Sequence, residues 1–152
     1  MKPDEALQRA ARLCSQQERS SAYIRGKLEN WGVSADDIDP VIQKLKAGNY
    51  IDDNRYATSY VRDKFRLNLW GKIKINHSLR QRGIREEIIL SALEQIDDEA
   101  YFETCKMLVQ NKNRELKDKN IFTRKAKLLR FAAQRGFESD IIYKVLNMLD
   151  KD

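Results

Sequence analysis

The sequence predicts an all-α fold made of three tandem three-helix repeats. Charged residues make up 34% of the 152 residues, while only two prolines and six glycines are present. This composition favours long helices over turn-rich β-sheets. Apolar residues recur at spacings of three and four, which is the period of an amphipathic helix. One glycine-containing segment also occurs three times along the chain, and this indicates a repeat architecture.

The repeated segment marks the end of the middle helix of each repeat. Its three copies are residues 27–33, 78–84 and 131–137. Gly32, Gly83 and Gly136 hold the same place in them, and an apolar residue follows each glycine. Glycine takes the left-handed conformation of a helix C-terminal cap at little cost, and the next apolar residue folds back onto the helix. We therefore expect the three glycines to occupy the same turn.

A third helix follows each glycine, and a first helix precedes each middle helix. The apolar positions of the third helices have helical spacing: Ile38, Val41, Ile42 and Leu45; Ile88, Ala92, Leu93 and Ile96; Ile141, Val145, Leu146 and Leu149. The first helices of the second and third repeats open with paired aspartates, namely Asp52 with Asp53 and Asp97 with Asp98. Such carboxylates suit a helix N-cap and the positive end of the helix dipole. Metal binding in a nuclease is the alternative role for these four carboxylates, and their place at helix starts favours capping.

These elements place the three repeats at residues 1–50, 51–96 and 97–152. One short helical triplet buries little apolar surface, so we expect neighbouring repeats to stack into an elongated, curved body. The third repeat carries a basic insertion around residues 110–120. This insertion is either a longer first helix or a basic loop.

Positive charge is concentrated in the middle and C-terminal parts of the chain. The formal net charge is +6. From residue 62 to 85 the chain has eight basic residues and one acidic residue, and from residue 106 to 135 it has ten basic and two acidic residues. Because clustered charge attracts an oppositely charged partner, the sequence predicts contact with nucleic acid or with an acidic protein groove.

Aligning the second and third repeats pairs basic side chains of their middle helices. The candidate partner-binding or DNA-binding residues are Lys72, Lys74, His77 and Arg82 in the second repeat and Lys125, Lys127, Arg130 and Arg135 in the third. Lys74 and His77 fall on one stripe of their helix, as do Lys127 and Arg130. A pattern that occurs in two repeats predicts two equivalent contact points. A solvated helix face with no partner is the alternative interpretation.

Five of the aromatic residues fall into two groups. Tyr56, Tyr60, Tyr101 and Phe102 lie in the first helices of the second and third repeats and are expected in the core. Trp70 lies within the basic segment beside a glycine. We expect its ring to be exposed enough to stack on a partner.

Several classes of protein are disfavoured. Cys14 and Cys105 lie in helical apolar patterns, so we expect core thiols and not a disulfide framework. His77 has no second histidine or suitably spaced cysteine, so we expect no metal or other cofactor. Phosphate-binding and nucleophile motifs are missing, which argues against an enzyme. With no signal-peptide stretch and no apolar run of transmembrane length, we expect a cytoplasmic monomer without membrane contact.

Three segments resemble the RecX family in their order and sequence. They are RSSAYIRGKL at residues 19–28, GNYIDDNRYA at residues 48–57, and WGKIKI followed by LRQRGI within residues 70–84. The order of the segments is more specific than any one of them. The match covers roughly the first hundred residues, and the third repeat follows through the internal repetition.

The resemblance implies a non-enzymatic protein that lodges along the groove of the RecA filament on DNA. Such a protein modulates, and usually inhibits, RecA recombinase and ATPase activity in homologous recombination, DNA repair and the SOS response. The resemblance also implies direct contact with single- or double-stranded DNA. A sequence-nonspecific DNA-binding helical repeat protein without a RecA partner is the alternative.

Overall fold

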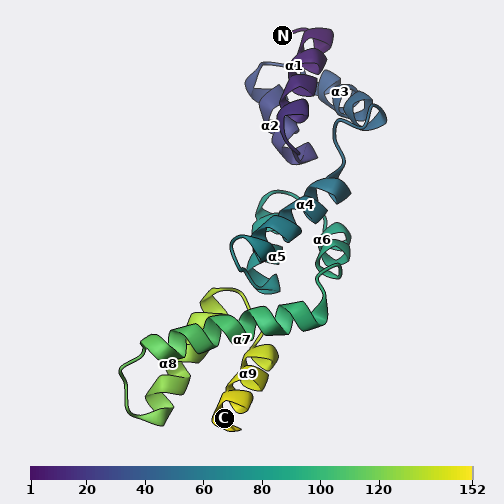
Figure 1. The fold of residues 1–152 in the computed structure, drawn as a ribbon. Coiled ribbons are helices and arrows are strands. Elements are labelled where there is room, and N and C mark those ends of the chain that lie inside the picture. The colour runs from purple at the N-terminus through teal and green to yellow at the C-terminus, as the bar shows by residue number, and fades with distance from the viewer. Residues whose placement is uncertain (152) are drawn as a thin grey trace. The chain divides into compact units, whose positions relative to one another are not determined.

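The computed structural model describes residues 1–151, and over this range the chain forms nine α-helices and no β-strand (Figure 1). The helices are α1 Pro3–Gln16, α2 Ser21–Asn30, α3 Ala35–Ala47, α4 Asp53–Arg66, α5 Lys72–Gln81, α6 Glu86–Leu93, α7 Asp98–Glu115, α8 Ile121–Gln134 and α9 Ser139–Lys151. The all-α prediction is confirmed. Among the described residues, no helix combines the length and the apolarity needed to cross a membrane.

Aspartates cap the first helices of the second and third repeats. The Asp52 carboxylate accepts a hydrogen bond of 3.2 Å from the backbone N–H of Arg55 at the start of α4. The Asp97 carboxylate accepts one of 2.9 Å from Ala100 at the start of α7. These bonds satisfy backbone donors that have no partner inside the helix. The predicted capping role is therefore confirmed for these two residues.

The three repeated glycines occupy the same turn, as predicted. Gly32, Gly83 and Gly136 have φ values of 79°, 79° and 99°. In the first copy, the Gly32 N–H donates to the carbonyl three residues earlier and the Val33 N–H donates to the carbonyl five residues earlier, both at 3.0 Å. The other two copies repeat this pair of bonds. The pattern is a Schellman motif, in which glycine avoids the strain that a Cβ would bring.

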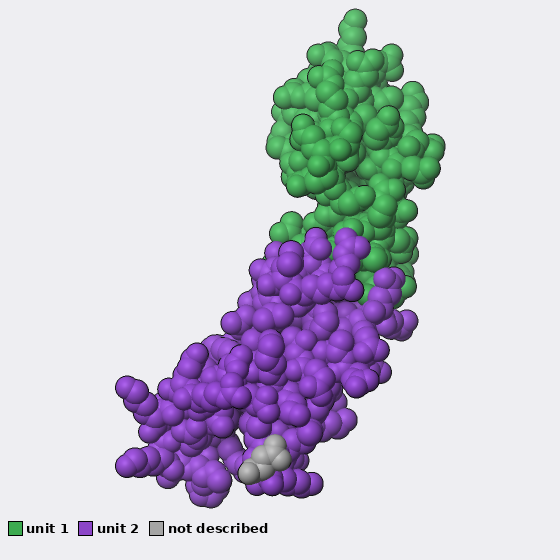
Figure 2. Space-filling model, viewed as in Figure 1, with its two compact units in different colours: residues 1–60, 79–92 green, residues 61–78, 93–152 purple. Residues whose placement is uncertain are grey.

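The chain forms two compact units (Figure 2). The first unit contains residues 1–60 and 79–92, and the second contains residues 61–78 and the chain from residue 93 onward. The breaks fall inside α4, α5 and α6, so each helix of the middle repeat contributes residues to both units.

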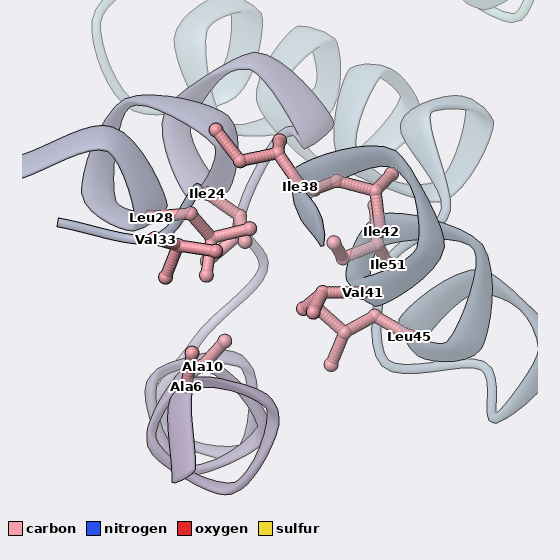
Figure 3. Close-up of a cluster of buried hydrophobic side chains, with 10 residues drawn as sticks. All are labelled: Ala6, Ala10, Ile24, Leu28, Val33, Ile38, Val41, Ile42, Leu45 and Ile51. Carbon is pink, nitrogen blue, oxygen red and sulfur yellow. The ribbon is translucent and has the colours of Figure 1, made fainter. Parts of the chain in front are cut away.

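The core of the first unit lies among α1, α2 and α3 (Figure 3). Its buried side chains are Ala6, Ala10, Ile24, Leu28, Val33, Ile38, Val41, Ile42, Leu45 and Ile51. The α1 contribution consists of two alanines one turn apart, and such small side chains let helices approach closely. Val33, which follows the glycine of the first turn, is only 6% exposed. It therefore folds back onto its helix as the sequence predicts.

In the second unit, α7, α8 and α9 bury one face each. The buried residues of these helices are Tyr101, Cys105, Leu108, Val109, Leu128, Ala132, Ile142, Val145 and Leu146. The Tyr101 ring is 2% exposed and lies 5.1 Å from the Phe137 ring between centroids. Burial raises the pKa of the Cys105 thiol to about 12. Cys105 is thus an inert core thiol, and the half-buried Cys14 packs against the core of the first unit.

The prediction of core positions is wrong for the other three aromatic residues of the first helices. Tyr56, Tyr60 and Phe102 are half-buried and not core residues. The rings of Tyr56 and Tyr60 stack with centroids 6.0 Å apart. Helical spacing alone does not separate a fully buried ring from one at the edge of the core, because an amphipathic stripe includes both kinds of position.

The insertion in the third repeat lengthens two helices. α7 has 18 residues where α4 has 14, and α8 has 14 residues where α5 has 10. Each helix therefore gains four residues, about one turn. The connecting loops, residues 67–71 and 116–120, are both five residues long. The insertion is thus neither a longer first helix alone nor a longer loop, but a helical hairpin extended on both sides.

Candidate functional site

The start of α5, which carries candidate lysines, is held by the glycine turn of the third repeat. The Gly71 N–H donates to the Arg135 carbonyl at 2.7 Å, and the Ile73 N–H donates to the Gly136 carbonyl at 3.0 Å. A Cβ on Gly71 would collide with the Gly136 backbone. Since the first N–H groups of a helix have no partner within it, these carbonyls replace an ordinary N-cap. This contact fixes the position of Lys72 and Lys74.

The buried Tyr101 side chain of the second unit also holds the start of α5. Its hydroxyl accepts a hydrogen bond of 2.8 Å from the Lys72 backbone N–H and donates one to the Glu138 carboxylate. Burial and the Glu138 hydrogen bond raise the pKa of Tyr101 far above its ordinary value. The phenol therefore keeps its proton and remains a hydrogen-bond donor.

Replacing Tyr101 by phenylalanine is expected to lower the free energy of unfolding by about 1–3 kcal/mol. The change leaves the Lys72 N–H and the Glu138 carboxylate without the hydroxyl that joins them, while the ring still fills its place. Urea denaturation measures the effect. Tyr143→Phe, at a tyrosine that is 52% exposed, is the matched control. If both variants unfold like the parent, the hydroxyl does not stabilise the start of α5.

An analogous contact holds the start of α2 in the first unit. The Asp53 carboxylate accepts hydrogen bonds from the N–H of Ser21 at 2.8 Å and from its hydroxyl at 2.7 Å. A Cβ on Gly83 would lie 2.8 Å from the Ala22 Cβ. Asp53 therefore caps a helix of the preceding repeat, whereas the sequence led us to expect it to cap its own.

The α5 lysines lie over aromatic rings. The Lys74 Nζ is 4.6 Å from the centroid of the Trp70 ring, and the Lys64 Nζ is 4.9 Å from the same ring. The Lys72 Nζ is 4.7 Å from the Tyr101 centroid. Trp70 is thus half-buried between two ammonium groups and less open than expected. Within residues 1–151, neither Lys72 nor Lys74 forms an ion pair with a carboxylate.

The equivalent α8 lysines do have carboxylate partners. The Lys125 Nζ lies 2.6 Å from an Asp150 carboxylate oxygen, and the Lys127 Nζ lies 2.8 Å from one of Asp118. The Lys127 ammonium holds the pKa of Asp118 below its ordinary value. The alignment of the two repeats therefore predicts corresponding places on α5 and α8, but the electrostatic surroundings of the lysines differ.

The two candidate arginines follow the ends of α5 and α8 and stack on rings. The Arg82 Cζ lies 5.1 Å from the Tyr60 centroid, and the Arg135 Cζ lies 5.5 Å from the Phe131 centroid. A hydrogen bond with Tyr60 is the main cause of a raised pKa for Arg82. Arg135 also donates to the Asn68 carbonyl at 3.3 Å. Stacking leaves the edge of a guanidinium open for an oxyanion.

The remaining two candidates are exposed on their helices. His77 lies on α5 and Arg130 lies on α8. Both belong to the second unit together with the four candidate lysines and Arg135, whereas Arg82 belongs to the first unit. In the described part of the chain, no group of three or more histidine, cysteine or acidic side chains is placed to hold a metal ion.

The middle helix of each repeat starts without acidic residues. α2, α5 and α8 have none in their first turn, whereas every first and third helix has at least one: Asp4, Glu5, Asp36, Asp37, Asp53, Glu86, Glu87, Asp98, Glu99 and Asp140. First-turn carboxylates offset the positive end of the helix dipole. At the start of α2 the Asp53 carboxylate takes this role from outside the helix. Of the three middle helices, α5 and α8 therefore keep more of their positive character, which suits an anionic partner.

These features define a tandem three-helix-repeat protein whose candidate cations gather on and just after its middle helices. Models of the first, second and third three-helix domains of RecX match residues 6–45, 52–93 and 98–146. The chain belongs to the RecX family of regulatory proteins.

Individual relatives match over nearly the whole chain. Regulatory protein RecX of Pelodictyon phaeoclathratiforme is 32% identical over 144 residues, which cover 95% of this chain and 88% of the relative. Regulatory protein RecX of Prosthecochloris aestuarii is 33% identical over 144 residues, which cover 95% and 93%. The crystal structure of RecX from Lactobacillus salivarius matches with a TM-score of 0.91 at 27% identity and covers 99% of this chain and 97% of that one.

Proposed function

We propose that this protein binds the RecA filament on DNA and inhibits the recombinase and ATPase activities of RecA in homologous recombination and repair. Membership of a family of regulatory proteins supports a regulatory role. The RecX resemblance names RecA as the partner. In this proposal the protein acts in the cytoplasm as a monomer, works by binding alone and needs no cofactor.

The main support for the proposal is the pair of lysines at the start of α5. Lys72 and Lys74 stand on a helix that is fixed by another repeat, and no carboxylate pairs with them within residues 1–151. Cations on a fixed helix lose little conformational entropy when they bind phosphates or an acidic groove. The other proposed contacts are His77 and Arg82 in the second repeat and Lys125, Lys127, Arg130 and Arg135 in the third.

Repeats at residues 1–50, 51–96 and 97–152 would present this surface twice. The second and third repeats supply equivalent middle helices, α5 and α8, so one filament would be met at two points. Two linked contacts raise the overall affinity above that of either alone, because the second contact forms within the complex.

The DNA-dependent ATP hydrolysis and strand exchange of RecA test the proposal. We expect both to fall when the protein is added at a stoichiometric concentration. RecA activities that stay unchanged, together with retained DNA binding, would favour a DNA-binding repeat protein without a RecA partner. Magnesium-dependent loss of intact DNA that disappears on replacing Asp52 and Asp53 would instead indicate a nuclease.

A further inference from the structure

The extended α7–α8 hairpin ends in residues 116–124, which we call the hairpin tip (Figure 1). It consists of the loop after α7 and the first turn of α8, the turn by which α8 exceeds α5. This turn carries two exposed apolar side chains. Phe122 is 80% exposed and Ile121 is 55% exposed. A large exposed ring on a segment that one repeat has gained is a candidate contact site.

The tip is held in a fixed shape by one arginine. The Arg124 guanidinium donates to the carbonyls of Leu116 at 3.1 Å, Asp118 at 2.7 Å and Asn113 at 2.7 Å, and also to the Asn113 side chain at 2.6 Å. The loop therefore folds around a charged side chain that satisfies its carbonyls.

The N-cap of α8 fixes the ring itself. The Asn120 side chain accepts hydrogen bonds from the N–H groups of Phe122 at 2.9 Å and Thr123 at 3.1 Å. These bonds anchor the backbone that carries the exposed ring. A ring presented on ordered backbone loses little entropy on binding.

The charges around the ring are positive. Lys117 and Lys119 are exposed on the loop, and neither forms an ion pair with a described residue. The one carboxylate of the tip, Asp118, is bound by the Lys127 ammonium at 2.8 and 2.9 Å. The first turn of α8 contains no acidic residue. The hairpin tip thus has a flat aromatic ring with exposed lysines near it in the chain, and its charge is complementary to that of an anionic strand.

We propose that the hairpin tip binds single-stranded nucleic acid, with the Phe122 ring stacked on an unpaired base and Lys117 and Lys119 facing the backbone phosphates. A ring stacks on a base only where the base is unstacked from its neighbours, and this condition selects single strands over duplexes. The proposal adds a DNA contact to the RecA regulator proposed above. It concerns the protein's own affinity for DNA, so it can be tested without RecA.

Three replacements of Phe122 in the full chain test the stacking. The probe is a thymidine oligonucleotide that contains one 2-aminopurine, whose fluorescence is quenched when it stacks on a ring. We expect Phe122→Ala and Phe122→Leu to weaken binding about fivefold or more and to lose quenching, since stacking of one base contributes substantially to affinity. Phe122→Trp should retain both. Tyr143→Ala, at an exposed aromatic residue of α9, is the control and should bind like the parent.

The two lysines are tested by salt. Replacing Lys117 and Lys119 by glutamine should flatten the dependence of log affinity on log salt by roughly 1.4 for single strands, which is about 0.7 for each phosphate lost. Because Phe122 is exposed, circular dichroism should show an unchanged fold in every Phe122 variant.

Two results would overturn the tip proposal. One is parental affinity and quenching in Phe122→Ala. The other is parental DNA affinity of Phe122→Leu, which would show that an apolar side chain without a ring is sufficient and that the ring does not stack on a base. RecA ATP hydrolysis is read separately with the parent protein. If the parent protein does not change RecA ATP hydrolysis, the proposed regulation of RecA is contradicted. If the Phe122 variants bind DNA like the parent, the proposed DNA contact of the hairpin tip is contradicted.

Discussion

Gly136→Ala is expected to lower the free energy of unfolding by about 3 kcal/mol or more. Its φ of 99° strains any residue with a Cβ, at a cost of order 1–3 kcal/mol. The added Cβ would also lie 2.7 Å from the Lys74 backbone nitrogen and collide with the Lys74 Cβ. These atoms belong to the start of α5, which cannot move without losing its bonds to the Gly136 turn. Thermal or urea denaturation measures the loss.

Two other glycines separate the two causes. Gly32 has a φ of 79°, and a Cβ there would meet nothing within 4 Å, so Gly32→Ala should cost only the conformational strain, about 1 kcal/mol. Gly26 lies inside α2 with open space around it, so Gly26→Ala should leave the stability equal or raise it by up to about 1 kcal/mol. If Gly136→Ala costs no more than Gly32→Ala, the contact between the turn and α5 does not stabilise the fold.

Replacing Lys72, Lys74 and Arg82 together by alanine is expected to weaken DNA binding about tenfold or more. If each side chain engages one phosphate, the log–log salt slope on duplex DNA flattens by roughly 2.7. The helical content should stay the same, because none of the three side chains is fully buried and such basic side chains contribute little to stability. A salt titration by fluorescence anisotropy, with circular dichroism beside it, measures both quantities. An unchanged slope together with parental inhibition of RecA would show that these side chains are only solvated.

The α8 set gives a smaller change. Lys125 and Lys127 already neutralise Asp150 and Asp118. Replacing Lys125, Lys127 and Arg135 together by alanine should therefore flatten the log–log salt slope by less than replacing the α5 set does. The reciprocal variant, with Asp118→Asn and Asp150→Asn, releases both lysines and should tighten DNA binding. Equal slopes for the α5 and α8 sets would contradict this difference between the two helices.

Local signals in the sequence predict the helices and their turns well. A glycine followed by an apolar residue identified the turns at Gly32, Gly83 and Gly136, because the Schellman motif is built from bonds within six residues. Paired aspartates identified the starts of α4 and α7 for the same reason. The approximate place of the insertion was also predicted, but how the extra residues divide between α7 and α8 was not, since both segments are helical and polar.

Contacts between repeats lie beyond such signals. A glycine is needed at position 71 because the Gly136 backbone occupies the space that a Cβ would fill. Asp53 caps the start of α2 at Ser21, which lies 32 residues earlier in the chain. Neither partner is near in sequence. The difference between the two lysine sets arises in the same way, because Lys125 is paired by Asp150 at the far end of the third repeat. The alignment of the repeats finds corresponding lysines, and only the packed structure decides which of them are paired.

Binding to preassembled RecA filaments tests regulation of RecA most directly. The labelled protein is mixed with filaments formed on single-stranded DNA in the presence of a non-hydrolysable ATP analogue, and with the same DNA alone, at one salt concentration. A RecA regulator should bind the filament at least tenfold more tightly than the bare DNA, and the Lys72, Lys74 and Arg82 variant should lose most of this preference. Equal affinity for filament and bare DNA would contradict a RecA partner and leave a DNA-binding repeat protein.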